Sequence, residues 1–263
     1  MKTKKILIGL AKFAGVALFW FAIWALISFR INSQLLFPAP KSVIQALGKL
    51  AKTAEFWTTT VYSLLRVVLG ILASLFIGSG LAVLTEKSKI FKALFSPVLG
   101  VVKATPVASF IILALLWLDR NTLPLYITAL IVIPIVWSNV SEGIRAVDAE
   151  LVDVAKIYKF SVFKRITKLY VPSVAPFFMA ACKSSLGMAW KAGISAEVLS
   201  TPKYAIGTEL YFSKTYLETP TLFAWTAVII ILSVIIEKLF VLGLSVLGKK
   251  MHFIPKGDSN GKI

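Results

Sequence analysis

Long apolar blocks separated by short charged segments dominate the pattern of this chain. A helix that crosses a bilayer needs about 20 mostly apolar residues, and the blocks reach that length. They predict about six transmembrane helices, near residues 13–29, 61–84, 93–118, 123–140, 171–193 and 221–247. The third is interrupted at Pro106 and is expected to form two shorter pieces. The predicted fold class is therefore an all-α polytopic membrane protein.

The same pattern divides the chain into four segments. They are an N-terminal transmembrane helix (1–32), an amphipathic helix (33–60), a membrane core (61–248) that contains a charged loop (141–170), and a polar tail (249–263). The first block is too long for a signal-peptide core and lacks a small-residue cleavage site, which favours a retained membrane helix. In the second segment, Ser42 is expected to cap a helix that lies in the membrane interface.

Basic residues indicate the orientation in the membrane. Lysine and arginine outnumber aspartate and glutamate by 29 to 12, for a net charge of +17. They do not form one patch, so no nucleic-acid partner is expected. With a cytoplasmic N-terminus, 17 of them fall in inside segments and 6 in outside segments. Because cytoplasmic loops are enriched in Lys and Arg, both termini and the 141–170 loop are expected in the cytoplasm, and residues 33–60 outside.

The reactive side chains are few. One cysteine, Cys182, and one histidine, His252, cannot build a disulfide framework or a thiolate metal site. A membrane enzyme would need clustered catalytic groups, so no catalytic residue, metal or cofactor is expected. Residues 243–250 match the spacing of a nucleotide-binding P-loop, but Lys250 replaces the serine or threonine and no strand precedes them.

Two predicted spans carry a small residue at every fourth position. The rows are Gly70, Ser74 and Gly78 in the second span, and Ala181, Ser185, Ala189 and Gly193 in the fifth. Such rows let membrane helices approach closely. They predict either packing within the bundle or contact with a second copy or a transport path.

Several charges fall within apolar spans. Lys183 lies about 12 residues, or roughly 18 Å, into the fifth span, which is too deep for its amine to snorkel easily to the surface. Since such charges usually face protein or water, Lys183 is expected to face a solute pathway or to form a structural ion pair. Lys191 and Glu197, nearer the outer end, are further pathway candidates. Arg66 lies early in its span and is expected to snorkel.

The 141–170 loop carries six basic and four acidic residues and a spaced motif. Asp153-Val-Ala155 is followed by three residues, Lys159, nine residues, and Leu169-Tyr-Val-Pro172. This spacing resembles the EAA signature of bacterial ATP-binding cassette (ABC) importer permeases, in which glycine stands at the position of Lys159. Because lysine does not adopt a positive φ cheaply, we expect a plain helical or differently shaped turn there.

Other stretches are similar to the nitrate/sulfonate/taurine branch of these permeases. They are Ser63-x-x-Arg66 with Gly70, Lys103 to Ala108, Ala189-Trp190 with Glu197, and Ala205-Ile206-Gly207. The resemblance implies a type I importer permease fold in the bacterial inner membrane. It also implies three protein partners besides membrane lipid: a second permease subunit, as in a homodimer, an ATPase subunit bound near residues 152–164, and an external solute-binding protein. The residues that would couple to the ATPase are Asp153, Ala155, Lys159, Leu169 and Pro172.

The solute is less determined than the class. The resemblance implies a small anion such as nitrate or a sulfonate, or alternatively a precursor of thiamine or riboflavin, and Lys183 favours the anion. A secondary transporter or channel would share the six spans without needing an ATPase, and the charged loop would then be a solvated connector.

Overall fold

The computed structural model of the 263-residue chain describes the backbone of residues 2–250 and the side chains of residues 14–243. The predicted polar tail (249–263) lies outside the residues with described side chains. The described chain is helical and contains no strand. Its elements are α1 (Lys2–Ile31), α2 (Pro40–Leu50), α3 (Ala54–Lys87), α4 (Lys89–Ala104), α5 (Val107–Ala114), α6 (Leu123–Arg145), α7 (Ala149–Ile157), α8 (Val162–Arg165), the π-helical turn η1 (Ile166–Tyr170), α9 (Val171–Ser200), α10 (Ile206–Thr215) and α11 (Thr219–Lys250).

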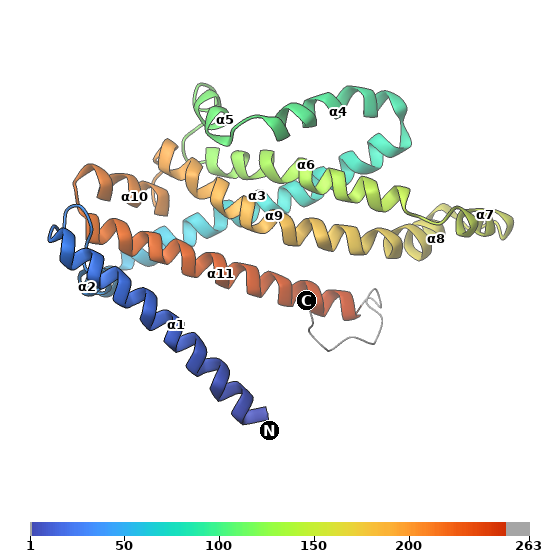
Figure 1. The fold of residues 1–263 in the computed structure, drawn as a ribbon. Helices are drawn as coiled ribbons and strands as arrows, with labels where there is room; N and C mark the ends of the chain where they lie inside the picture. The colour runs from blue at the N-terminus through green and yellow to red at the C-terminus, as the bar shows by residue number, and fades with distance from the viewer. Residues whose placement is uncertain (1, 251–263) are drawn as a thin grey trace.

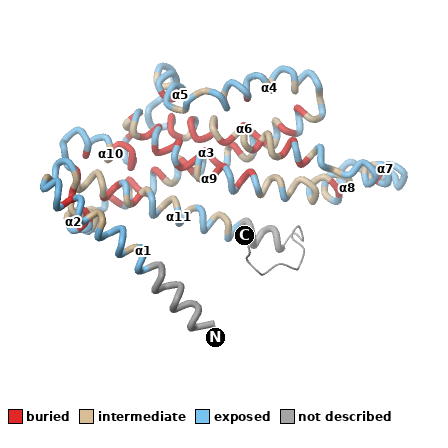
Figure 2. Tube along the Cα trace, in the orientation of Figure 1, coloured by how far each residue is buried: buried red, intermediate tan, exposed pale blue. Residues whose placement is uncertain are grey.

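Helices α3, α6 and α9 form the core of the bundle (Figure 1), and most buried residues lie on them (Figure 2). Two glycines on α3 allow its close approach to α6. A Cβ atom at Gly70 would lie 2.8 Å from Cβ of Thr128, and one at Gly78 would lie 2.8 Å from Cβ of Val136. The α3–α6 contact therefore depends on residues without side chains, as close helix packing in membranes does generally.

The small residues of α9 face the same core. Ala181, Ser185 and Ala189 are fully buried, and a Cβ atom at Gly193 would lie 2.6 Å from a methyl group of Val67 on α3. Ser74 on α3 is also fully buried, and its hydroxyl donates to the Gly70 carbonyl. Both rows of small residues thus contact helices of the same chain.

Four helices in the described part of the chain are long and apolar enough to cross a membrane: α1, α3, α6 and α11. Helices α4 and α5 pass the same test only as a pair, bent by 106° at Thr105–Pro106. The break agrees with the interruption predicted at Pro106. Helix α9 has 30 residues, which is enough to span, but is not among the helices that pass on apolarity. The span predicted near residues 171–193 therefore remains a prediction.

The two N-terminal helices meet at one end of the bundle. Helix α1 diverges from the other helices toward the N-terminus (Figure 1), and it is anchored near its other end, where the Trp24 indole donates to the Pro38 carbonyl. Helix α2 begins at Pro40 with Ala39 as its N-cap. The prediction that Ser42 caps this helix was wrong, because proline fits the first helical position, where no amide hydrogen is needed.

Candidate functional site

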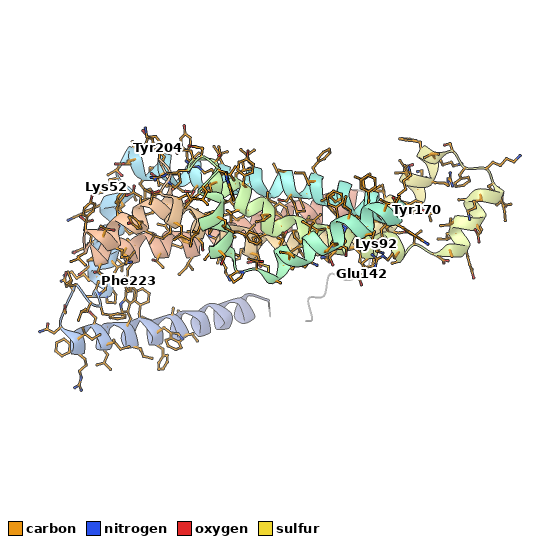
Figure 3. The ribbon with its side chains drawn as sticks, turned by 90° about the horizontal axis from the view of Figure 1, so that it is seen from above. Lys52, Lys92, Glu142, Tyr170, Tyr204 and Phe223 are labelled. Carbon is orange, nitrogen blue, oxygen red and sulfur yellow. The ribbon has the colours of Figure 1, made fainter. Side chains whose placement is uncertain are left out.

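The 141–170 loop projects from the end of the bundle opposite α10 (Figure 1), beyond Tyr170 in the view from above (Figure 3). Asp148 caps α7 by accepting a hydrogen bond of 2.8 Å from the Glu150 amide. Ser161 caps α8 by accepting one of 3.3 Å from the Lys164 amide. The segment therefore forms two short helices, since each has its own cap.

The break between α7 and α8 lies at Lys159. This residue has φ 48°, and its amide donates to the Lys156 carbonyl at 3.0 Å. The Phe160 amide donates to the Ala155 carbonyl at 2.9 Å. These two bonds form the Schellman ending that usually has glycine at the left-handed position. The expectation that Lys159 would avoid a positive φ was wrong. The carbonyls of Ala155 and Lys156 at the end of α7 accept these hydrogen bonds only if Lys159 takes the left-handed conformation that glycine usually supplies.

Large apolar side chains cover the surface of this loop without packing on the bundle. The exposed fractions are 76% for Ile157, 73% for Tyr158 and 76% for Phe163. Leu151 and Val154 on α7 are also exposed. Several large exposed apolar side chains on one short segment are typical of an interaction surface. We call these five residues the α7–α8 apolar surface.

The residues of the EAA-like motif lie in different surroundings. Ala155 and Leu169 are buried, and Pro172 lies half-buried in the first turn of α9. Asp153 is exposed and forms an ion pair of 2.8 Å with Lys156 one turn along α7. The apolar residues of the motif, Ala155, Leu169 and Pro172, thus pack against the rest of the chain, whereas Asp153 and Lys159 are exposed.

An ion-pair cluster joins three helix ends at the base of the loop. The Glu86 carboxylate, at the end of α3, accepts a hydrogen bond of 2.9 Å from Nε of Arg145 and a second, shorter one from Nη2. Lys92, in the first turn of α4, lies 3.7 Å from the same carboxylate. Because Arg145 is the last residue of α6, this bidentate contact fixes the point at which the chain leaves the bundle for α7.

One face of α9 has no neighbour in the described chain. It carries Lys183 and Lys191, which are exposed and about 12 Å apart along the helix axis. Gly187 lies between them, with nothing within 4 Å of where its Cβ would be. Neither lysine forms an ion pair with a residue in the described chain. We call this the open face of α9.

Glu197, near the C-terminal end of α9, is fully buried in a polar network at the α10 end of the bundle. Its carboxylate accepts hydrogen bonds from the Ser63 hydroxyl at 2.8 Å and from the Gly207 amide at 3.1 Å. The Arg66 guanidinium is 3.4 Å away. The Ser63 oxygen in turn accepts a bond of 2.9 Å from the Ile206 amide. Helices α3, α9 and α10 are thereby joined through one carboxylate.

Arg66 also holds the connection between α9 and α10. Its guanidinium donates to the carbonyls of Tyr204 at 2.9 Å, Lys203 at 2.6 Å and Asn121 at 3.1 Å. The Arg66 side chain is only 12% exposed, so in addition to the expected reach toward the membrane surface it binds backbone carbonyls of the protein. Thr201 and Tyr204 in this connection have φ 47° and 50°, so Arg66 stabilises a strained segment.

Three stretches that resemble the permease family separately meet at this network: Ser63-x-x-Arg66, Glu197, and Ile206-Gly207. Sequence reasoning placed Glu197 with the two lysines of α9 as a pathway candidate, whereas the structure buries Glu197 in this network and leaves both lysines exposed. It gave no role to Asn121, whose amide oxygen accepts from the Lys203 amide at 3.0 Å. The only sequence signal for this network was that all three stretches resemble the same branch of permeases.

Comparisons with known proteins show which proteins this chain is similar to. The chain is 26% identical over 205 residues to a putative aliphatic sulfonates transport permease of Bacillus subtilis, covering 77% of this chain and 74% of the relative. It is 21% identical to the taurine transport system permease of Escherichia coli, covering 87% and 83%. It is 28% identical to a nitrate import permease of Synechococcus elongatus, covering 52% and 50%.

A solved structure shares the fold. The crystal structure of an amino acid ABC transporter with histidines matches with a TM-score of 0.53 at 17% identity, covering 86% of this chain and 98% of that chain. Residues 70–247 match the family model described as binding-protein-dependent transport system inner membrane component. The chain belongs to this family and is a multi-pass permease of the plasma membrane.

Proposed function

We propose that two copies of this chain form the solute pathway of an ATP-driven importer for a small anion. The 141–170 loop of each copy docks on a separate ATPase subunit through the α7–α8 apolar surface, and an external solute-binding protein delivers the anion. The observation that carries the anion assignment is the open face of α9, which presents two lysines and no carboxylate.

The cost of a membrane charge supports this role for the open face. Lys183 lies in the middle of a 30-residue helix, and an unpaired ammonium group facing lipid there would be costly. Water or a second protein surface must therefore cover it. Two copies that place their open faces toward a shared pathway would meet this requirement, and would surround a passing anion with lysines from both sides.

The named relatives support the same solute class. They include permeases for aliphatic sulfonates, taurine and nitrate. Bicarbonate permeases also match, at 26% identity over 156 residues. The precursor of thiamine or riboflavin weighed as an alternative has no support among these relatives.

Partner binding is tested first. The tagged chain, extracted in mild detergent, is expected to bring down an ATPase subunit with vanadate-sensitive activity. The double substitution Ile157→Asp with Phe163→Asp is expected to abolish this association, because it charges the α7–α8 apolar surface. Lys203→Gln, at the opposite end of the bundle, serves as the control. A wild-type chain that emerges alone would contradict the importer assignment.

Anion transport is tested in the reconstituted complex. Lys183→Gln is expected to reduce uptake of sulfonate or nitrate by tenfold or more, on the order of 1.4 kcal/mol per factor of ten, while ATP hydrolysis continues. Lys214→Gln, exposed on α10, is the matched control. Unchanged uptake in the Lys183 variant would remove the anion argument without affecting the ATPase result.

A further inference from the structure

A cavity of about 510 Å³ lies between the last turns of α1 and the start of α2. Its apolar part is formed by Ala25 and Phe29 of α1 together with Ala39 and Pro40 at the start of α2. Asn32, Ser33, Gln34 and Lys41 form most of its polar part. Its volume falls in the range typical of small-ligand sites. It is separate from the α9 open face, the outer polar network and the 141–170 loop.

The position of the cavity corresponds to the boundary between membrane and water. The apolar span of α1 covers Ala14–Ile31 and ends beside the cavity. Helix α2, which forms the other wall, is amphipathic: Val43 is buried while Gln45 and Lys49 are exposed. Since the polar headgroups of a bilayer begin where the hydrocarbon core ends, the cavity opens at headgroup level.

The lining has an excess of positive charge. Lys41 is its only charged residue, and no ion pair to Lys41 exists within the part of the chain that the structure describes. The start of α2 adds partial positive charge, because its N-cap Ala39 has no side chain that could accept from the first amides. Asn32, Ser33 and Gln34 supply neutral donors.

We propose that this cavity binds the phosphate headgroup of a membrane phospholipid. The Lys41 ammonium donates to the phosphate oxygens, the polar groups of residues 32–34 hydrogen-bond to the glycerol or headgroup, and Ala25 and Phe29 contact the start of the acyl chains. A bound lipid would fill the angle between α1 and α2 and so fix α1 against the bundle. This inference does not depend on the proposed anion transport.

Lipid binding to the purified full-length chain can be measured by native mass spectrometry. Phosphatidylglycerol is expected to bind, and diacylglycerol with the same acyl chains is not. Lys41→Gln should weaken phosphatidylglycerol binding about tenfold, the effect of losing one charge-assisted hydrogen bond. Lys49→Gln, two turns further along α2 and outside the cavity, should leave binding unchanged.

A second variant tests the cavity rather than the charge. Ala25→Trp, on the exposed side of α1, should fill the cavity and reduce lipid binding as strongly as Lys41→Gln. Equal binding of diacylglycerol and phosphatidylglycerol, or full retention of lipid by both variants, would overturn the proposal. Displacement of the lipid by millimolar inorganic phosphate would overturn it too, because the site would then belong to a free anion.

Discussion

Lys159 is a lysine in a position built for glycine. Its left-handed conformation costs roughly 1–2 kcal/mol for a residue with a Cβ atom, and it is kept because the end of α7 needs the two hydrogen bonds around it. Lys159→Gly is therefore expected to slow amide hydrogen exchange at the end of α7. Lys159→Val should accelerate it, because a β-branched residue fits this conformation worse. The reverse order of the two variants would contradict a left-handed turn.

Glu197 can be tested as a structural or a pathway residue. Glu197→Gln keeps the shape but removes the negative charge beside Arg66, and breaking a buried ion pair costs about 3–5 kcal/mol. We expect a clearly lower melting temperature in detergent. Glu218→Gln, an exposed carboxylate near α10, is the control. An unchanged melting temperature together with lost uptake would instead place Glu197 in the solute pathway.

These residues show what sequence reasoning can reach at this scale. The sequence shows that Arg66 and Glu197 are charges near membrane spans. It does not show that they pair with each other, because they are 131 positions apart and only the three-dimensional packing brings them together. The prediction for the turn at Lys159 was wrong for a different reason. The cost of its conformation was estimated correctly, but the helix-end hydrogen bonds that outweigh this cost belong to the fold.

The contact between α3 and α6 depends on where each glycine lies on the helix. Gly78 and Gly80 are two residues apart, but a Cβ atom at Gly78 would meet Val136 at 2.8 Å, whereas one at Gly80 would have nothing within 4 Å. Gly78→Ala is expected to destabilise the chain by about 1–3 kcal/mol through overpacking. Gly80→Ala should be neutral or slightly stabilising, because alanine favours helix. Thermal unfolding of both variants checks this, and equal effects would contradict the packing.

The cluster of Glu86, Arg145 and Lys92 connects the end of α6 to α3 and α4, directly before α7. We expect Glu86→Gln to loosen this connection, so that the complex still binds its ATPase but hydrolyses ATP with less uptake per ATP. Glu218→Gln, an exposed carboxylate near α10 at the other end of the bundle, should not change this ratio. A normal ratio in the Glu86 variant would show that the cluster has no part in coupling.

Elements were predicted best where the pattern is longest. The apolar blocks of α3, α6 and α11 were identified, with ends shifted by up to seven residues, because apolar blocks of membrane length have few alternatives. The short helices were less predictable. Helix α2 begins two residues before the predicted cap Ser42, and the 141–170 loop contains two short helices, because caps and helix-end turns rather than hydrophobic periodicity set the limits of such helices.

At the scale of the whole molecule, the bundle has two different ends. The 141–170 loop projects from one, and α10 lies at the other (Figure 1). The loop carries six basic residues and residues 194–220 carry two, Lys203 and Lys214. The distribution of basic residues predicts that the loop end is cytoplasmic, which is the side where an ATPase subunit would have ATP.

This orientation can be measured with single cysteines, because the chain has only one natural cysteine, Cys182, which is buried. In a Cys182→Ala background, Thr215→Cys on α10 is expected to react with a membrane-impermeant thiol reagent in intact cells. Ser161→Cys, between α7 and α8, should react only after the membrane is permeabilised. Both positions are exposed, so access to the reagent depends on the side of the membrane. The opposite result would place the α7–α8 apolar surface outside the cell, where no ATPase could bind it, and the proposed coupling would fail even if the fold were correct.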